Sequence, residues 1–149
     1  MPTVAIAAAK PARSIERPVA TATAIARAYW GTMPCGGKVR VLARRSLPAG
    51  LSRPSSAWAT FATPLGSNNL AASPATYTDC AISLASWRWP DARTMRADWD
   101  VLCMTVVHEM GHLLGHAHDS TAGSVMAPVF ADMSAEPQLC RAARARSSQ

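Results

Sequence analysis

The chain has 149 residues, a common length for one domain around one hydrophobic core. Hydrophobic residues make up 49% of it and charged residues 16%, which excludes a disordered chain, and no apolar run approaches the roughly 20 residues that cross a bilayer. The formal charge of +6 would suit nucleic acid, but the arginines are spread thinly and no aromatic and basic stripe accompanies them, which argues against a nucleic-acid-binding domain.

The first half of the chain predicts one helix followed by strands. We expect residues 1–17 to form an irregular N-terminal segment, and apolar residues at helical spacing after Pro18 predict a helix over 18–30. Stretches in which apolar residues alternate with others predict three strands, at 39–43, 58–62 and 80–87.

The second half predicts two helices separated by a loop. One helix runs from about Met95 to Leu114, the stretch 119–130 is loop and turn, and a short terminal helix covers 134–145. Residues 141–149, "RAARARSSQ", form the only basic cluster, and we expect a solvated basic tail there.

The four cysteines are Cys35, Cys80, Cys103 and Cys140, widely spaced and without a CxxC pair. This pattern does not indicate a cysteine zinc site; two disulfides in an exported protein fit it better than four buried thiols in a cytosolic one. Four cysteines allow three pairings. The N-terminal stretch has no cation before its short apolar run, so no export signal is evident.

All four histidines lie within "HEMGHLLGHAHD", residues 108–119. On a helix, residues four apart share one face, so His108 and His112 can bind the same ion. Glu109 lies beside the first histidine, where a carboxylate can reach the water on a metal without being a ligand. The spacing HExxH therefore indicates a metal site with a general base.

A zinc ion that keeps one position open for water takes three protein ligands. The third cannot come from further along the same straight helix, so the chain must fold back. Gly115 can adopt a left-handed conformation and end the helix sharply, after which His118 has the length to reach the metal. His116 lies inside the reversal, and we interpret it as a surface imidazole or one that supports a ligand.

These residues resemble the metzincin metallopeptidases, whose signature HExxHxxGxxH precedes a methionine turn. "SVMAP" supplies the turn with Met126, eight residues after His118, and the run to Phe130 is most similar to the matrixin branch. Two positions depart from that branch: Ala127 stands where an aromatic residue is usual, and Phe130 where tyrosine is common. Asp119 also stands where matrixins usually have serine.

The resemblance implies an α+β fold over residues 1–149 as a single catalytic domain. A small twisted mixed sheet would pack on a first helix and a central active-site helix, and a short C-terminal subdomain would follow the Met-turn. Residues 58–62 would form the edge strand to which an extended substrate adds. The family's second, structural zinc needs histidines upstream of the helix, and this chain has none there.

The activity implied is that of a zinc-dependent endopeptidase with one catalytic Zn²⁺. By resemblance, Glu109 is the general base, Met126 forms an apolar floor below the metal, and Pro128 and Phe130 wall the substrate pocket. The metal ligands are His108, His112 and His118. We expect a protein or peptide substrate and a secreted or extracytoplasmic monomer; calcium is unsupported, because the aspartates show no calcium-loop spacing.

The alternative function is a non-catalytic binding module stabilised by zinc. Structural zinc usually has a fourth protein ligand, and Glu109 would then have no purpose in the base position. The two functions can be distinguished by an assay of whether Glu109 is needed for activity.

The resemblance also indicates which cysteines form disulfides with each other. It places Cys35 and Cys80 in the upper subdomain, and it places Cys103 on the active-site helix, beneath which a C-terminal segment with Cys140 could pack. We therefore expect the pairs Cys35–Cys80 and Cys103–Cys140. A rival interpretation takes "PCGG" as a latency switch, because latent matrixins carry a Pro-Arg-Cys-Gly segment whose thiolate caps the zinc; here the following Pro-Asp is missing.

Overall fold

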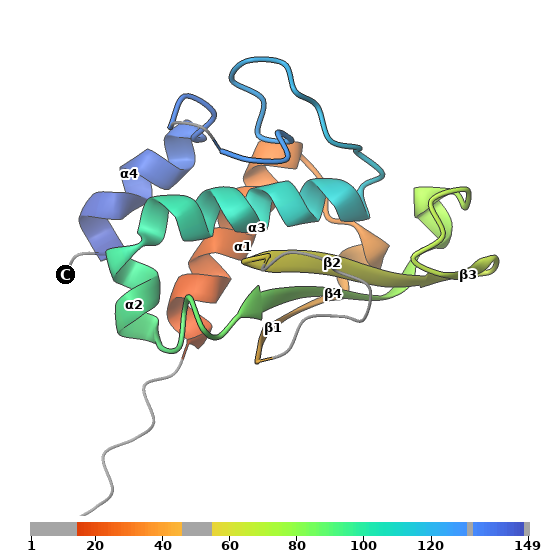
Figure 1. The fold of residues 1–149 in the computed structure, drawn as a ribbon, viewed down its shortest axis with the longest axis horizontal. Coiled ribbons are helices and arrows are strands. Elements are labelled where there is room, and N and C mark those ends of the chain that lie inside the picture. Colours follow the sequence, from red (N-terminus) through yellow and green to blue (C-terminus); the bar gives the residue numbers. More distant parts are fainter. Residues whose placement is uncertain (1–14, 46–54, 131–132, 148–149) are drawn as a thin grey trace, which may run out of the picture.

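The computed structural model describes residues 15–45, 55–130 and 133–147. Most of the irregular segment expected at 1–17 lies outside these ranges, and the first helix begins at Glu16, two residues before the predicted start. Figure 1 shows the elements, which in chain order are α1 (Glu16–Trp30), η1 (Cys35–Gly37), β1 (Val39–Arg44), β2 (Ala57–Thr63), β3 (Gly66–Ser67), η2 (Pro74–Thr76), β4 (Thr78–Ala85), α2 (Ala92–Ala97), α3 (Trp99–Leu113) and α4 (Gln138–Ser147).

The sheet is mixed, as predicted, with the strand order β1-β4-β2-β3. β4 is the central strand: it pairs in parallel with β1 and antiparallel with β2, and it is buried from Cys80 to Ala85. β3 reaches only Ala62 and Thr63 of β2. Among the described residues, no strand pairs with the outer edge of β2 between Ala57 and Thr60, so this edge keeps backbone groups that an added strand could use.

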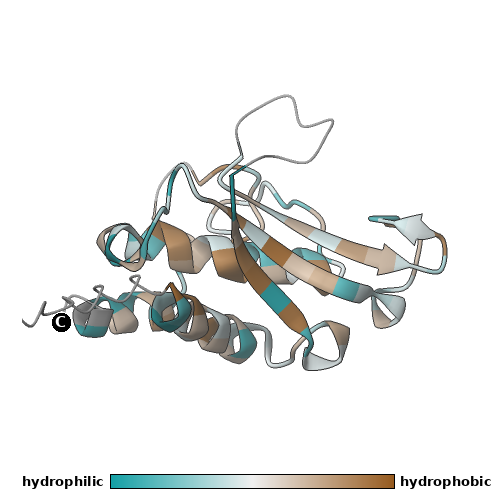
Figure 2. Ribbon diagram, turned by 90° about the horizontal axis from the view of Figure 1, so that it is seen from below, coloured by the Kyte–Doolittle hydropathy of each residue, from teal (hydrophilic) through white to brown (hydrophobic). Residues whose placement is uncertain are grey.

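α3 is the central helix of the molecule. Nearly all of its residues are buried, because it contacts α1, α4 and β2 on different sides (Figure 1). Its sequence is correspondingly apolar around most of its circumference, as expected for a helix in the core. Hydrophobic residues of both helices and strands contribute to this core, and Figure 2 shows them as brown segments in each layer.

The single helix predicted from Met95 to Leu114 is wrong at its start, because the chain forms two helices with a break at Asp98. Asp91 caps α2 by accepting from the Thr94 N–H at 2.8 Å. At Asp98 the backbone leaves the helical region (φ −108°, ψ 32°), and its carboxylate accepts from Arg88 Nε and Trp89 Nε1, both at 2.9 Å. These partners lie on another segment, which helical periodicity cannot reveal.

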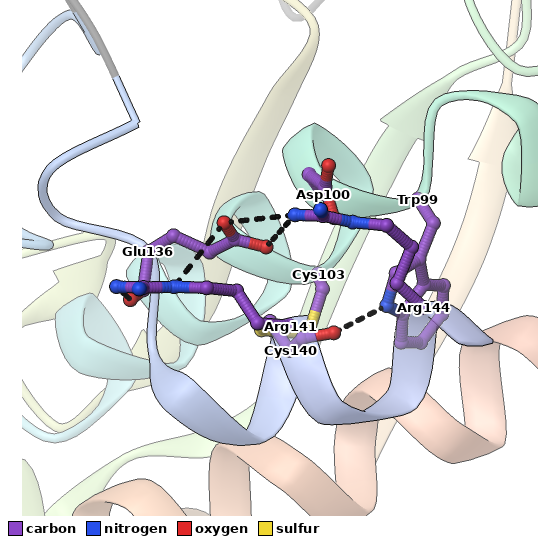
Figure 3. Close-up of polar contacts among 7 residues, drawn as sticks. All are labelled: Trp99, Asp100, Cys103, Glu136, Cys140, Arg141 and Arg144. Atoms are coloured by element: carbon purple, nitrogen blue, oxygen red, sulfur yellow. Dashed lines mark hydrogen bonds and ion pairs between the residues drawn. A yellow bond between two sulfur atoms is a disulfide. The ribbon is translucent and has the colours of Figure 1, made fainter. Parts of the chain in front are cut away.

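The stretch 141–149, expected to be a solvated tail, is helical as far as Ser147, where α4 ends, and two of its arginines form ion pairs, while residues 148–149 lie outside the described residues. Arg144 forms ion pairs with Asp100 at 2.7 Å and with Glu136 at 3.1 Å, and Arg141 lies 3.6 Å from Glu136 (Figure 3). The Glu136 side chain is only 2% exposed. A buried carboxylate of this kind needs cationic partners, and α4 supplies them.

Both predicted disulfides are confirmed. Cys35 is bonded to Cys80, and Cys103 is bonded to Cys140, which joins α3 to α4 (Figure 3). Next to the second bridge, Trp99 Nε1 donates to the Cys140 carbonyl at 2.9 Å. The disulfide also rules out the latency switch, because the Cys35 thiol is not available to cap a metal. Within the described ranges, no helix has the length and apolar character of a membrane span.

We predict that replacing Cys103 and Cys140 together by alanine lowers the free energy of unfolding by about 3 kcal/mol, because the bridge closes a long loop in the unfolded chain. Urea denaturation followed by circular dichroism measures this. Wild-type protein under reducing conditions is the control and should lose more stability, since both bridges then open. A change below about 1 kcal/mol would contradict the prediction.

Candidate metal centre and cleft

The three predicted metal-ligating histidines converge in the structure. His108 and His112 lie one turn apart on α3, with their Nε2 atoms 3.1 Å apart, and His118 reaches back from the following loop to place its Nε2 atom 3.2 Å from that of His112. One ligand atom from each of the three lies within 4.8 Å of the others. The helix and the turn after it thus bring the three predicted ligands together.

Backbone carbonyls orient two of these rings. His108 Nδ1 lies 2.7 Å from the Val125 carbonyl, and His112 Nδ1 lies 2.8 Å from the His116 carbonyl. A carbonyl only accepts, so each Nδ1 carries the proton and each Nε2 keeps a lone pair. Two lone pairs facing each other at 3.1 Å repel unless a cation lies between them. The donor set therefore fits a metal, and tetrahedral zinc would hold its nitrogens about 3.3 Å apart.

The protonation states suit the same role. Burial is the main reason that the pKa of His108 is lowered to about 4, with a partly opposing contribution from the Val125 carbonyl. Burial also lowers the pKa of His112. Both rings are therefore neutral at neutral pH, which is the form that binds a metal ion.

The chain reverses at Gly115, as predicted. Its φ of +91° is in the region that disfavours other residues, and the ring of Pro74, from η2, packs against the position that a Cβ would occupy. The His116 N–H donates to the Gly111 carbonyl at 2.9 Å and closes the turn. Glycine is therefore needed at position 115 for two reasons: the turn requires a positive φ, and a side chain there would clash with Pro74 of η2.

His116 supports its neighbours, as the sequence interpretation proposed. Its ring stacks on Trp30 with the ring centroids 4.4 Å apart, and Trp30 Nε1 donates to the Val107 carbonyl at 2.9 Å. The stack fixes the segment whose carbonyl holds His112. Sequence reasoning missed Trp30 and Val125 in these roles, because neither residue belongs to a spacing pattern.

Met126 lies against α3 between the two turns that carry the first two histidines. It is 4% exposed, and a Cβ built on Gly111 would lie 2.5 Å from Met126 Sδ. Its carbonyl accepts from the Asp119 N–H at 2.9 Å, which ties the methionine turn to the segment after His118. Only glycine at 111 leaves room for this contact.

Glu109 lies beside the imidazoles and is 7% exposed. Burial raises its pKa to about 7, while a hydrogen bond from the Ala59 N–H of β2 acts in the opposite direction. A carboxyl group with this pKa can exchange protons near neutral pH. The edge strand and the metal-binding helix thus meet at this side chain.

A cleft of about 670 Å³ opens beside Glu109 and His108. The residues that line it include Val101 and Thr105 of α3 and, from the segment after Met126, Pro128 and Phe130. Phe130 meets the His108 ring edge to face, with centroids 5.7 Å apart. The volume lies within the range of sites that receive a small ligand or a side chain.

The fold and this site define a class: an α+β protein whose HExxH helix, glycine turn and methionine turn form a three-histidine metal site of the metzincin type. The family model "Matrixin" matches residues 32–142, and the chain belongs to the matrixin family. The searches of curated proteins and of solved structures returned no match. Family and site together point to a zinc metallopeptidase.

The buried titratable groups give a prediction for metal-free protein. Since the pKa of His108 falls from 6.5 to about 4 on folding, its contribution to stability is present above pH 6.5 and is lost as the pH falls towards 4. Since the pKa of Glu109 rises from 4.5 to about 7, its contribution is present below pH 4.5 and is lost as the pH rises through 7.

The two effects oppose each other between pH 4.5 and 6.5 and can be separated by substitution. Metal-free Glu109→Gln should become more stable with rising pH in this window, and metal-free His108→Gln should become less stable, each by up to about 3 kcal/mol. Urea denaturation in chelator at several pH values measures both slopes. Equal slopes in the two variants would contradict the prediction.

Proposed function

We propose that the chain is a zinc-dependent endopeptidase in which Glu109 is the general base. The observation that carries this proposal is the position of Glu109: a buried carboxyl group in the wall of the same cleft as His108, which converges with His112 and His118. In the metal-free protein burial raises its pKa to about 7, so this carboxyl group can take up and release a proton near neutral pH.

His108, His112 and His118 would hold the ion, which when bound supplies a Lewis acid that activates water and polarises a carbonyl group. Glu109 takes the proton from the attacking water and returns it to the leaving nitrogen, so it acts first as a base and then as an acid. The Val125 and His116 carbonyls keep His108 and His112 in the tautomer that binds metal.

An extended substrate would add as an antiparallel strand to the outer edge of β2. Supporting this, the edge between Ala57 and Thr60 has no strand partner among the described residues, and the Ala59 N–H on β2 already reaches Glu109. The side chain after the scissile bond would enter the cleft beside Pro128 and Phe130. Met126 would form the apolar floor of the site.

The binding-module alternative is less well supported. Within the described ranges, the metal-binding group consists of three histidines without a fourth protein ligand, which is the pattern of a catalytic zinc site. Two disulfides support our further proposal of a secreted protein, and we propose one catalytic domain that works as a monomer.

Replacement of Glu109 by glutamine tests the proposed function. We expect a loss of activity of about 10²–10⁴-fold on casein or a quenched peptide, because the base is removed while the three imidazoles remain. Zinc measured by elemental analysis should stay at one ion per chain. Glu16→Gln, on α1, is the matched control and should keep full activity.

Two outcomes would contradict the proposed function. One is wild-type protein that holds no zinc or shows no chelator-sensitive activity, and the other is a Glu109→Gln variant as active as wild type. A binding module would have no activity to lose.

The cleft gives a prediction about selectivity. Val101→Phe puts a larger side chain into the lining of the cleft, so kcat/KM should fall about tenfold for a peptide with leucine after the scissile bond. A peptide with alanine there is the internal control and should be cleaved at nearly the wild-type rate. Peptide assays with the matched pair measure this, and an equal loss for both peptides would contradict the assignment of the cleft.

A further inference from the structure

A second cavity lies away from the metal centre, among α1, α2, α3 and α4. Its volume is about 650 Å³, close to that of the cleft beside Glu109. The wall includes Trp99, the first residue of α3, which is nine residues before His108 and so about 14 Å away along the helix axis. Figure 1 shows α2 and α4 at this end of α3, far from its histidine end.

Three arginines from three helices line this cavity: Arg17 of α1, Arg96 of α2 and Arg146 of α4. None of them forms an ion pair with another described residue. The neighbouring carboxylates, Asp100 and Glu136, are already bound by other arginines (Figure 3). The cavity therefore keeps a positive charge that the described part of the chain does not neutralise.

The other groups of the wall offer little to a cation. Pro18 and Ala143 are apolar, Trp99 Nε1 already donates to the Cys140 carbonyl, and the Thr21 hydroxyl donates to the Arg17 carbonyl. None of the described residues that line the cavity carries a carboxylate. The donors that its described residues leave for a ligand are thus guanidinium groups, and much of the rest of the wall is apolar, a combination that favours an anion.

The helices that carry the cavity's residues are linked to one another by covalent and polar contacts. The disulfide from Cys103 to Cys140 joins α4 to α3, and the ion pair from Arg144 to Asp100 adds a second link (Figure 3). Asp98 binds Arg88 and Trp89 at the junction of α2 and α3, which holds the end of α2 that carries Arg96. Preorganised walls reduce the entropy that binding must overcome.

We propose that this cavity binds a small, multiply charged oxyanion, with carboxylate, sulfate or phosphate groups that pair with Arg17, Arg96 and Arg146. A guanidinium group can form two parallel hydrogen bonds with two oxygens of a planar carboxylate or of a tetrahedral sulfate or phosphate group. The volume fits a compact ligand with two or three anionic groups. The site is independent of the proposed peptidase activity, since none of its residues lines the metal cleft.

Titration calorimetry on the full chain, loaded with zinc, tests this proposal with two probes that chelate metal weakly. Inositol hexasulfate carries tetrahedral sulfate groups, and benzene-1,3,5-tricarboxylate carries planar carboxylate groups. We expect saturable binding of at least one probe at one site per chain, weakening as the salt concentration rises. The tighter probe identifies the kind of anionic group that the site prefers.

The double variant Arg96→Gln/Arg146→Gln should bind at least about tenfold more weakly, because it removes two of the three charge-assisted pairs. Arg40→Gln/Arg93→Gln loses the same net charge at exposed positions outside this cavity and is the matched control. Circular dichroism checks that both variants are folded. The proposal is overturned if neither probe binds saturably, or if the control weakens binding as much as the test variant.

Discussion

The structure of the site depends on two hydrogen bonds to backbone carbonyls, one from His108 to Val125 and one from His112 to His116. They fix which nitrogen of each ring is unprotonated and aim it at a common point. Each acceptor lies on a segment after the helix, so the loop that delivers His118 also supplies the carbonyl for His112. The third ligand and the orientation of the second are thus set by the same reversal at Gly115.

This reversal in turn requires a rigid central helix. α3 is held at its start by the Cys103–Cys140 bridge and at its end by Trp30, which binds the Val107 carbonyl and stacks on His116. Burial around the helix lowers the pKa of His108 and raises that of Glu109, so packing keeps the imidazole neutral and lets the carboxyl group gain or lose a proton near neutral pH. The core therefore determines the chemistry of the site as well as its shape.

The metal-ligating residues could be predicted because their spacing is a direct consequence of helix geometry. Alternation in the sequence located the strands, although burial does not alternate along them, because β4 is buried at every residue from Cys80 to Ala85. The features that the sequence did not predict depend on contacts between distant segments. Asp98, where α2 ends, binds Arg88 and Trp89. Trp30 and Ala59 contact the helix of the site from elements whose sequences carry no metal motif. Local patterns cannot show such partners, because the information lies in the tertiary arrangement.

The arginines illustrate the same limit. In the sequence they look alike, and solvent exposure is the natural expectation for each. In the structure, Arg141 and Arg144 neutralise the buried Glu136, while Arg17, Arg96 and Arg146 surround a cavity without an acidic partner in the described ranges. Repulsion within that second group costs stability that an anion would recover. Five of the 15 basic residues, whose excess argues weakly for nucleic acid in the sequence, thus fall into a structural pair and a group of three suited to binding a small anion.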